Sequence, residues 1–102
     1  LALNGTIEYV GNDAGMLNRI AWNFYEQVED KTALKTAQQW ASRAFELQTS
    51  AAILDTDAHL LFKIGAKEEA ISKATEALSL AQMKGEDTTS YKETLAKFKD
   101  GK

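Results

Sequence analysis

Apolar residues recur along this chain at spacings of three and four, the periodicity of helices that each bury one face. The first such stripe lies between residues 14 and 29 and consists of Leu17, Ile20, Ala21, Phe24, Tyr25 and Val28. Further stripes follow at residues 32–48, 51–64 and 67–84, and a last one begins near residue 88. The pattern therefore predicts five helices and an all-α fold.

Polar residues and glycines mark the ends of these helices. Asp13 and Thr32 precede the first two stripes as candidate N-caps, and Asp87 or Thr88 precedes the last. Gly65 and Gly85 follow the third and fourth stripes, where a left-handed residue closes a helix. The connections are short, so we expect consecutive helices to be antiparallel neighbours.

Part of the apolar pattern occurs twice. The shared feature is a set of alanines with the same spacing in both copies, offset by 33 residues: Ala37, Ala41 and Ala44, then Ala70, Ala74 and Ala77. Two helices per unit, with small residues where helices approach closely, is typical of helical repeats, which bind or brace other proteins. We expect one helical domain over residues 14–102, closed by an amphipathic last helix, after an N-terminal segment at residues 1–13.

The second unit resembles a tetratricopeptide repeat. The residues that carry the resemblance are Leu54, Ala58, Leu61, Gly65, Glu69, Ala70, Ile71, Ala74, Ala77, Leu78 and Leu80. The first unit fits more loosely, through Ala21, Phe24, Tyr25, Val28, Ala37, Ala41 and Ala44. This resemblance implies an antiparallel array of two helix pairs and a capping helix, with a concave inner face that binds extended peptides. Asp57 replaces an apolar residue of the repeat, so we expect that corner to be open to water.

Residues 17–22 (LNRIAW) and 54–63 (LDTDAHLLFK) are similar to segments in the helical C-terminal extension of thioredoxin-family proteins from Bacteroidetes. This likeness spans roughly residues 14–100. It implies a helical appendage whose partner is its own N-terminal thioredoxin-like domain, which would carry the redox-active Cys-x-x-Cys pair. The chain has no cysteine, so no redox-active residue transfers to it.

Composition narrows the possible functions. Hydrophobic residues make up 44% and charged residues 26% of the 102 residues, as in soluble globular proteins. A net charge of −3 argues against nucleic acid as a partner, because binding phosphates requires a basic face. No apolar run is long enough for membrane insertion. The chain begins at Leu1 without a signal-like stretch, so we expect a mature product or a piece of a longer protein.

In the tetratricopeptide register, six residues fall on the inner face as the candidate partner-binding groove: Trp22, Glu26, Glu29, Asp55, His59 and Phe62. An aromatic pair rimmed by acids suits an apolar or basic segment of a protein or peptide. The alternative is that this patch packs against the chain's own preceding domain or against residues 1–12. Association of two copies through the open ends of a short array is a further possibility.

A different hypothesis places a small metal-dependent or acid–base enzyme at His59, with Glu26 and Asp55 as its partners. Asp55 precedes His59 by one helical turn, and Glu26 aligns with it at the 33-residue offset. The alternative interpretation makes His59 a polar residue on an exposed inner surface. One histidine and scattered carboxylates make a poor metal site, so we assign no catalytic residue, no metal ligand and no cofactor, and expect a non-enzyme.

Overall fold

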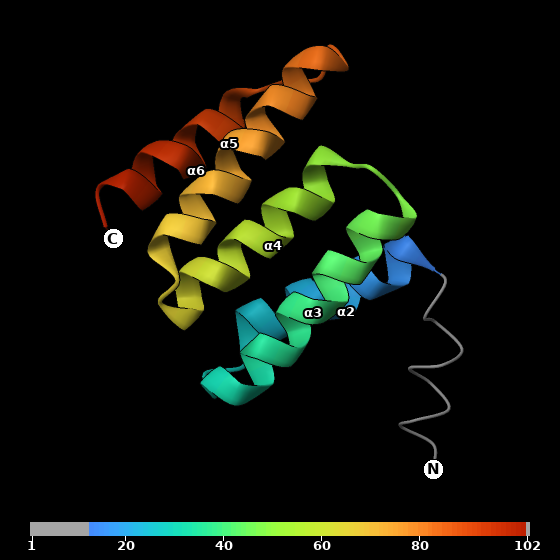
Figure 1. Cartoon of the computed structure of the whole chain (residues 1–102), viewed down its shortest axis with the longest axis vertical. Helices are drawn as coiled ribbons and strands as arrows, with labels where there is room; N and C mark the ends of the chain where they lie inside the picture. Colours follow the sequence, from blue (N-terminus) through green and yellow to red (C-terminus); the bar gives the residue numbers. More distant parts are fainter. Residues whose placement is uncertain (1–12, 102) are drawn as a thin grey trace.

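Five helices make up most of the computed structural model, which describes residues 13–101 (Figure 1). They are α2 (Ala14–Gln27), α3 (Lys31–Leu47), α4 (Ala51–Ile64), α5 (Lys67–Met83) and α6 (Thr89–Lys99). No strand occurs within the described range, so the all-α prediction is confirmed for it. Residues 1–12 of the predicted N-terminal segment lie outside the described residues.

Side-chain caps begin three of the helices. Asp13 accepts a hydrogen bond from the backbone N–H of Met16 at 3.0 Å, which confirms its predicted role. For α3 the prediction of Thr32 was wrong: Asp30 is the N-cap and accepts from the N–H of Ala33 at 3.0 Å. Because Asp30 already accepts this hydrogen bond at the helix start, α3 begins at Lys31 and includes Thr32.

Glycine closes α4 as the sequence predicted. Gly65 has a φ of 106°, in the left-handed region that favours glycine, and its N–H donates to the backbone oxygen of Leu61. Gly85, with a φ of 72°, likewise follows the end of α5. Both reversals let the next helix start within a few residues.

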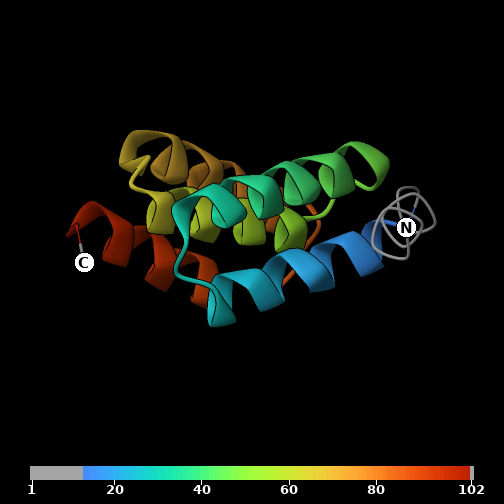
Figure 2. The same ribbon diagram turned by 90° about the horizontal axis from the view of Figure 1, so that it is seen from below.

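Helix α4 lies at the centre of the arrangement. It contacts α2, α3 and α5, while α2 also packs on α3 and α6 on α5. Figure 1 shows the chain turning back on itself at the connections from α3 to α4, α4 to α5 and α5 to α6. In Figure 2, α2 and α6 lie on the lower side and α3 and α5 on the upper side, with α4 between them.

The core is rich in alanine. Most alanines of α3 and α5 are at most 2% exposed: Ala37, Ala41, Ala44, Ala70, Ala74, Ala77 and Ala81. Because alanine has a short side chain, these faces let α4 approach both helices closely. Larger side chains fill the gaps, above all Leu34, Leu60 and Phe98, each at most 2% exposed.

The spacing of the helix starts differs from the offset of the alanine pattern. The N-caps of α2 and α4 are Asp13 and Ser50, 37 residues apart (50 − 13), and those of α3 and α5 are Asp30 and Ala66, 36 apart (66 − 30). The offset of 33 therefore does not match the helix starts. Alanines recur along α3 and α5 at spacings of three and four. The alanines of the two helices therefore align at an offset of 33 as well as at one helical turn more.

Asp57 corrects a second expectation. The sequence predicted a corner open to water, yet Asp57 is only 2% exposed. Its Oδ1 accepts a hydrogen bond from Nε2 of Gln38 on α3, at 2.9 Å. An amide donor on the neighbouring helix thus satisfies the carboxylate and makes its burial tolerable.

The lengths and polarity of the five helices indicate whether any of them could cross a membrane. Within residues 13–101, no helix is both long enough and apolar enough to cross a bilayer.

Candidate functional site

Five rings form a continuous aromatic cluster across α2, α4 and α6. The ring of Trp22 lies 4.8 Å from that of Tyr25 and 5.2 Å from that of His59, measured between centroids. His59 also meets Tyr25 edge to face at 5.2 Å and Phe98 at 5.3 Å. Phe98 in turn stacks on Phe62 at 4.3 Å, with only 6° between the planes. Edge-to-face and stacked contacts are favourable aromatic geometries, so the cluster ties the three helices together.

A cavity of about 590 Å³ opens beside this cluster and is called the inner cavity below. Its lining comes from α2, α4 and α6: Tyr25, Glu26, Phe62, Lys63, Lys97 and Phe98. Three aromatic rings and three charged groups therefore face one space. A hollow of this size that combines apolar walls with a few charged groups is typical of ligand sites.

Lys63 joins α4 to the end of α2. Its Nζ donates to the backbone oxygen of Tyr25 and lies 3.0 Å from Oε2 of Glu29. The same ammonium lies 5.3 Å from the centroid of the Tyr25 ring, within the range of a cation–π contact. The Glu29 side chain is 85% exposed, so the ion pair is well hydrated and adds little stability.

His59 and Asp55 pair along α4. The Nδ1 of His59 lies 2.8 Å from the backbone oxygen of Asp55 and 3.5 Å from its Oδ2. The His59 side chain is 13% exposed, so it is more buried than the interpretation as a residue of an exposed surface expected. Burial raises the pKa of the Asp55 carboxyl, and nearby His59 opposes this shift. The rings of Trp22, Tyr25 and Phe98 cover the imidazole from α2 and α6.

The groups proposed for a metal or acid–base site are not gathered into a ligand cluster. Within the described part of the chain, no group of three or more His, Asp or Glu side chains is arranged to hold a metal ion. Glu26 is exposed and lines the inner cavity, whereas His59 is turned toward Asp55.

Cavity lining and individual contacts connect the six residues predicted for the groove. Glu26 and Phe62 line the inner cavity, Trp22 and His59 belong to the aromatic cluster, and Asp55 pairs with His59. Glu29 reaches the cavity through Lys63. Sequence reasoning missed four lining residues: Tyr25, Lys63, Lys97 and Phe98.

The spacing between the starts of α2 and α4 would have indicated one of them. At an offset of 37, Trp22 aligns with His59 and Tyr25 with Phe62, so the pattern would have added Tyr25, which also packs against the core, to the predicted groove. Lys97 and Phe98 lie on α6, which matches neither helix of the repeat. No periodic signal could place them.

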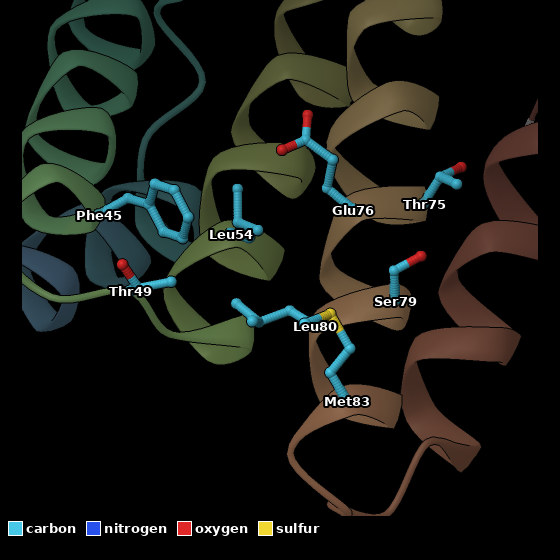
Figure 3. A pocket seen from close by; sticks show the side chains of 8 residues that line it. All are labelled: Phe45, Thr49, Leu54, Thr75, Glu76, Ser79, Leu80 and Met83. Atoms are coloured by element: carbon cyan, nitrogen blue, oxygen red, sulfur yellow. The ribbon is translucent and has the colours of Figure 1, made fainter.

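A second, smaller hollow of about 300 Å³ lies between α3, α4 and α5 and is called the outer pocket below (Figure 3). Eight residues line it: Phe45, Thr49, Leu54, Thr75, Glu76, Ser79, Leu80 and Met83. One of these residues, Thr49, accepts a hydrogen bond at its backbone oxygen from Nζ of Lys84, at 2.6 Å. The lining is mainly apolar, with Glu76 as its one charged member among the described residues.

Comparisons of the chain with protein-family models, with curated proteins and with solved structures found no significant match. The resemblances to tetratricopeptide repeats and to the thioredoxin-family extension therefore stay predictions. The geometry of the inner cavity is the basis on which a function can be assigned.

Proposed function

We propose that this chain is a non-catalytic protein-interaction or scaffold module that binds a segment of a partner protein in the inner cavity. In this proposal the five helices form an antiparallel tetratricopeptide-like array, with α2 paired to α3, α4 paired to α5, and α6 as the capping helix. The inner cavity between α2, α4 and α6 is then the concave face of a short array.

The helix contacts support the array. Each proposed pair is in contact, and α4 also packs on α2 and α3 of the first pair. The contact of α6 with α5 and the ring contacts of Phe98 with His59 and Phe62 support a capping position of α6 on the second pair. Small buried side chains on α3 and α5 fit this mode of packing.

One observation carries the binding proposal: three aromatic rings from three helices line a single cavity that is open to solvent. Tyr25, Phe62 and Phe98 supply a rigid apolar floor, and rigid aromatic floors are favoured anchor sites in protein interfaces. Phe98 is 2% exposed and fixed by its stacking on Phe62, so the floor is already formed before a partner arrives.

The resemblance to a thioredoxin-family extension suggests which partner to consider first. A thioredoxin-like domain of the parent protein would be held next to the inner face by its covalent connection. The high effective concentration that a linker provides makes even a weak contact effective. A second copy of this chain is the other partner considered in the sequence analysis.

Selection of peptides from a random library on the immobilised protein tests the proposal. Peptides chosen by the wild-type chain should bind at least tenfold more weakly to a Phe62→Ala variant. Phe45→Ala is the matched control, because Phe45 is also a partly buried phenylalanine but lines the outer pocket. Circular dichroism verifies that both variants remain helical.

If Phe62→Ala and Phe45→Ala lose the same affinity for the selected peptides, or if neither loses affinity, the inner cavity is not the binding site. Glu26→Trp provides a second variant that should not disturb folding, since Glu26 is exposed on the rim. The indole would occupy the cavity, so it should also reduce binding of the selected peptides.

A further inference from the structure

We infer that the segment bound in the inner cavity carries a bulky apolar side chain next to an aspartate or glutamate. This inference rests on the proposed function and specifies the chemistry of the partner. The apolar side chain would contact the rings of Tyr25, Phe62 and Phe98, and the carboxylate would face the ammonium groups of Lys63 and Lys97.

The charges that line the cavity carry the inference. Two of them are positive, Lys63 and Lys97, and one is negative, Glu26. This local balance is opposite in sign to the net charge of −3 of the whole chain. The sequence predicted an acid-rimmed groove and hence an apolar or basic partner, because it did not reveal the two lysines.

Two of the three acids of that predicted rim, Asp55 and Glu29, are already engaged. The Asp55 carboxylate lies 3.5 Å from His59 Nδ1, and Glu29 pairs with Lys63 outside the cavity lining. Lys97, by contrast, has no ion-pair partner among residues 13–101. Its ammonium is the charged group of the cavity that is most available to an incoming carboxylate.

Lys63 also retains binding capacity. An ammonium group has three N–H donors. Two partners of Lys63 use these donors: the backbone oxygen of Tyr25 and the carboxylate of Glu29. One donor is left for a ligand. Because Glu29 is 85% exposed, its hold on Lys63 is weak and a ligand carboxylate can share or replace it.

The arrangement also sets the direction of the bound segment. Glu26 comes from α2 and Lys97 from α6, so the negative and positive groups stand on different helices of the lining. A bound carboxylate is repelled by Glu26 on α2 and attracted by Lys97 on α6. We therefore expect the acidic residue of the ligand to lie over α6 and its apolar neighbour over the rings.

A peptide library with a fixed central phenylalanine and randomised flanking residues tests this inference. Selection at low salt on the wild-type chain should enrich aspartate and glutamate beside the phenylalanine. On Lys97→Glu the acidic preference should disappear or become basic, and an acidic peptide should lose affinity about twofold to fivefold, as expected for one exposed charge pair. Lys35→Glu is the control, since Lys35 is an exposed lysine on α3.

The outcomes separate this inference from the proposed function. Binding that depends on Phe62 but shows a basic preference, or none, overturns the inference and leaves the proposed function standing. Binding that does not depend on Phe62 overturns both. An acidic preference that Lys97→Glu and Lys35→Glu weaken equally also overturns the inference, because it would reflect general charge rather than this cavity.

Discussion

Gln38 of α3 donates a hydrogen bond from Nε2 to Oδ1 of Asp57 in the middle of α4, over 2.9 Å. Asp57 is 2% exposed and is one of the few buried polar side chains within residues 13–101. Burial raises the pKa of the Asp57 carboxyl, while Gln38 and Lys73 of α5 oppose the shift. Glu69 and Glu76, also on α5, add to it.

This pair predicts how stability depends on pH. A raised folded-state pKa means that the folded chain holds the proton more tightly than the unfolded chain. The unfolding free energy should therefore fall as pH rises from the ordinary aspartate pKa through the raised value, by at most about 1.4 kcal/mol per pH unit for one group.

Asp57→Asn isolates this effect, because the amide keeps an acceptor oxygen for Gln38 and cannot ionise. Urea unfolding from pH 4 to pH 7 should show the variant gaining stability relative to the wild type as pH rises. Asp55, whose pKa is also raised, is present in both proteins, so its effect cancels in the difference. The prediction would be contradicted if the unfolding free energies of the variant and the wild type changed equally with pH.

Phe98 should hold α6 in place. It is the one buried residue of this helix, and an isolated helix of 11 residues is marginal in water. Phe98→Ala should lower the free energy of unfolding by about 3–5 kcal/mol in urea titrations, since a large buried ring is lost. Lys97→Ala, an exposed neighbour, should change it by less than about 0.5 kcal/mol. A similar loss in the two variants would show that Phe98 is not the anchor.

Two glycines should respond in opposite ways to the same substitution. Gly65 has a φ of 106° and no atom within 4 Å of an added Cβ, so Gly65→Ala costs only the backbone strain, about 1–2 kcal/mol. Gly15 lies inside α2, where Gly15→Ala should stabilise by about 0.5–1 kcal/mol. Thermal melts should show shifts of opposite sign, and equal shifts would refute the assigned conformations.

The close contact of α5 with α4 predicts that Ala77 tolerates no larger side chain. Ala77 is fully buried, and Ala77→Leu should destabilise by about 1–3 kcal/mol through overpacking. Ala52→Leu makes the same change at an exposed position of α4 and should lie within about 0.5 kcal/mol of the wild type. Denaturant unfolding of both variants compares them directly, and a neutral Ala77→Leu would mean that the two helices are not closely packed there.

Much of the helical framework could be predicted because its signals are local. The bounds of α4, the cap at Asp13 and the left-handed Gly65 follow from neighbouring residues, and all three are observed. The cap of α3 was misplaced by two residues because Asp30 and Thr32 both have side chains that accept hydrogen bonds from a helix start. Neighbouring polar residues of this kind compete to cap the same helix. The pattern of apolar residues does not show which of them does so.

The candidate site was only partly predictable. Glu26 and Phe62, both predicted for the groove, line the same cavity although they are 36 residues apart. Lys63 was not predicted, because its position depends on the backbone oxygen of Tyr25 and on Glu29 in the connection between α2 and α3. The charge of the cavity depends on Lys63 and on Lys97 of α6, which the predicted groove residues did not include.

The sequence by itself determined that this chain forms helices, where most of them end, and which small residues are buried. These properties depend on contacts within one or two helical turns. The tertiary structure alone decided that Asp57 is buried against Gln38, that Phe98 covers His59 and Phe62, and that two lysines face the rings. Each of these depends on how helices distant in the chain lie against one another, and periodicity within a helix holds no information on that packing.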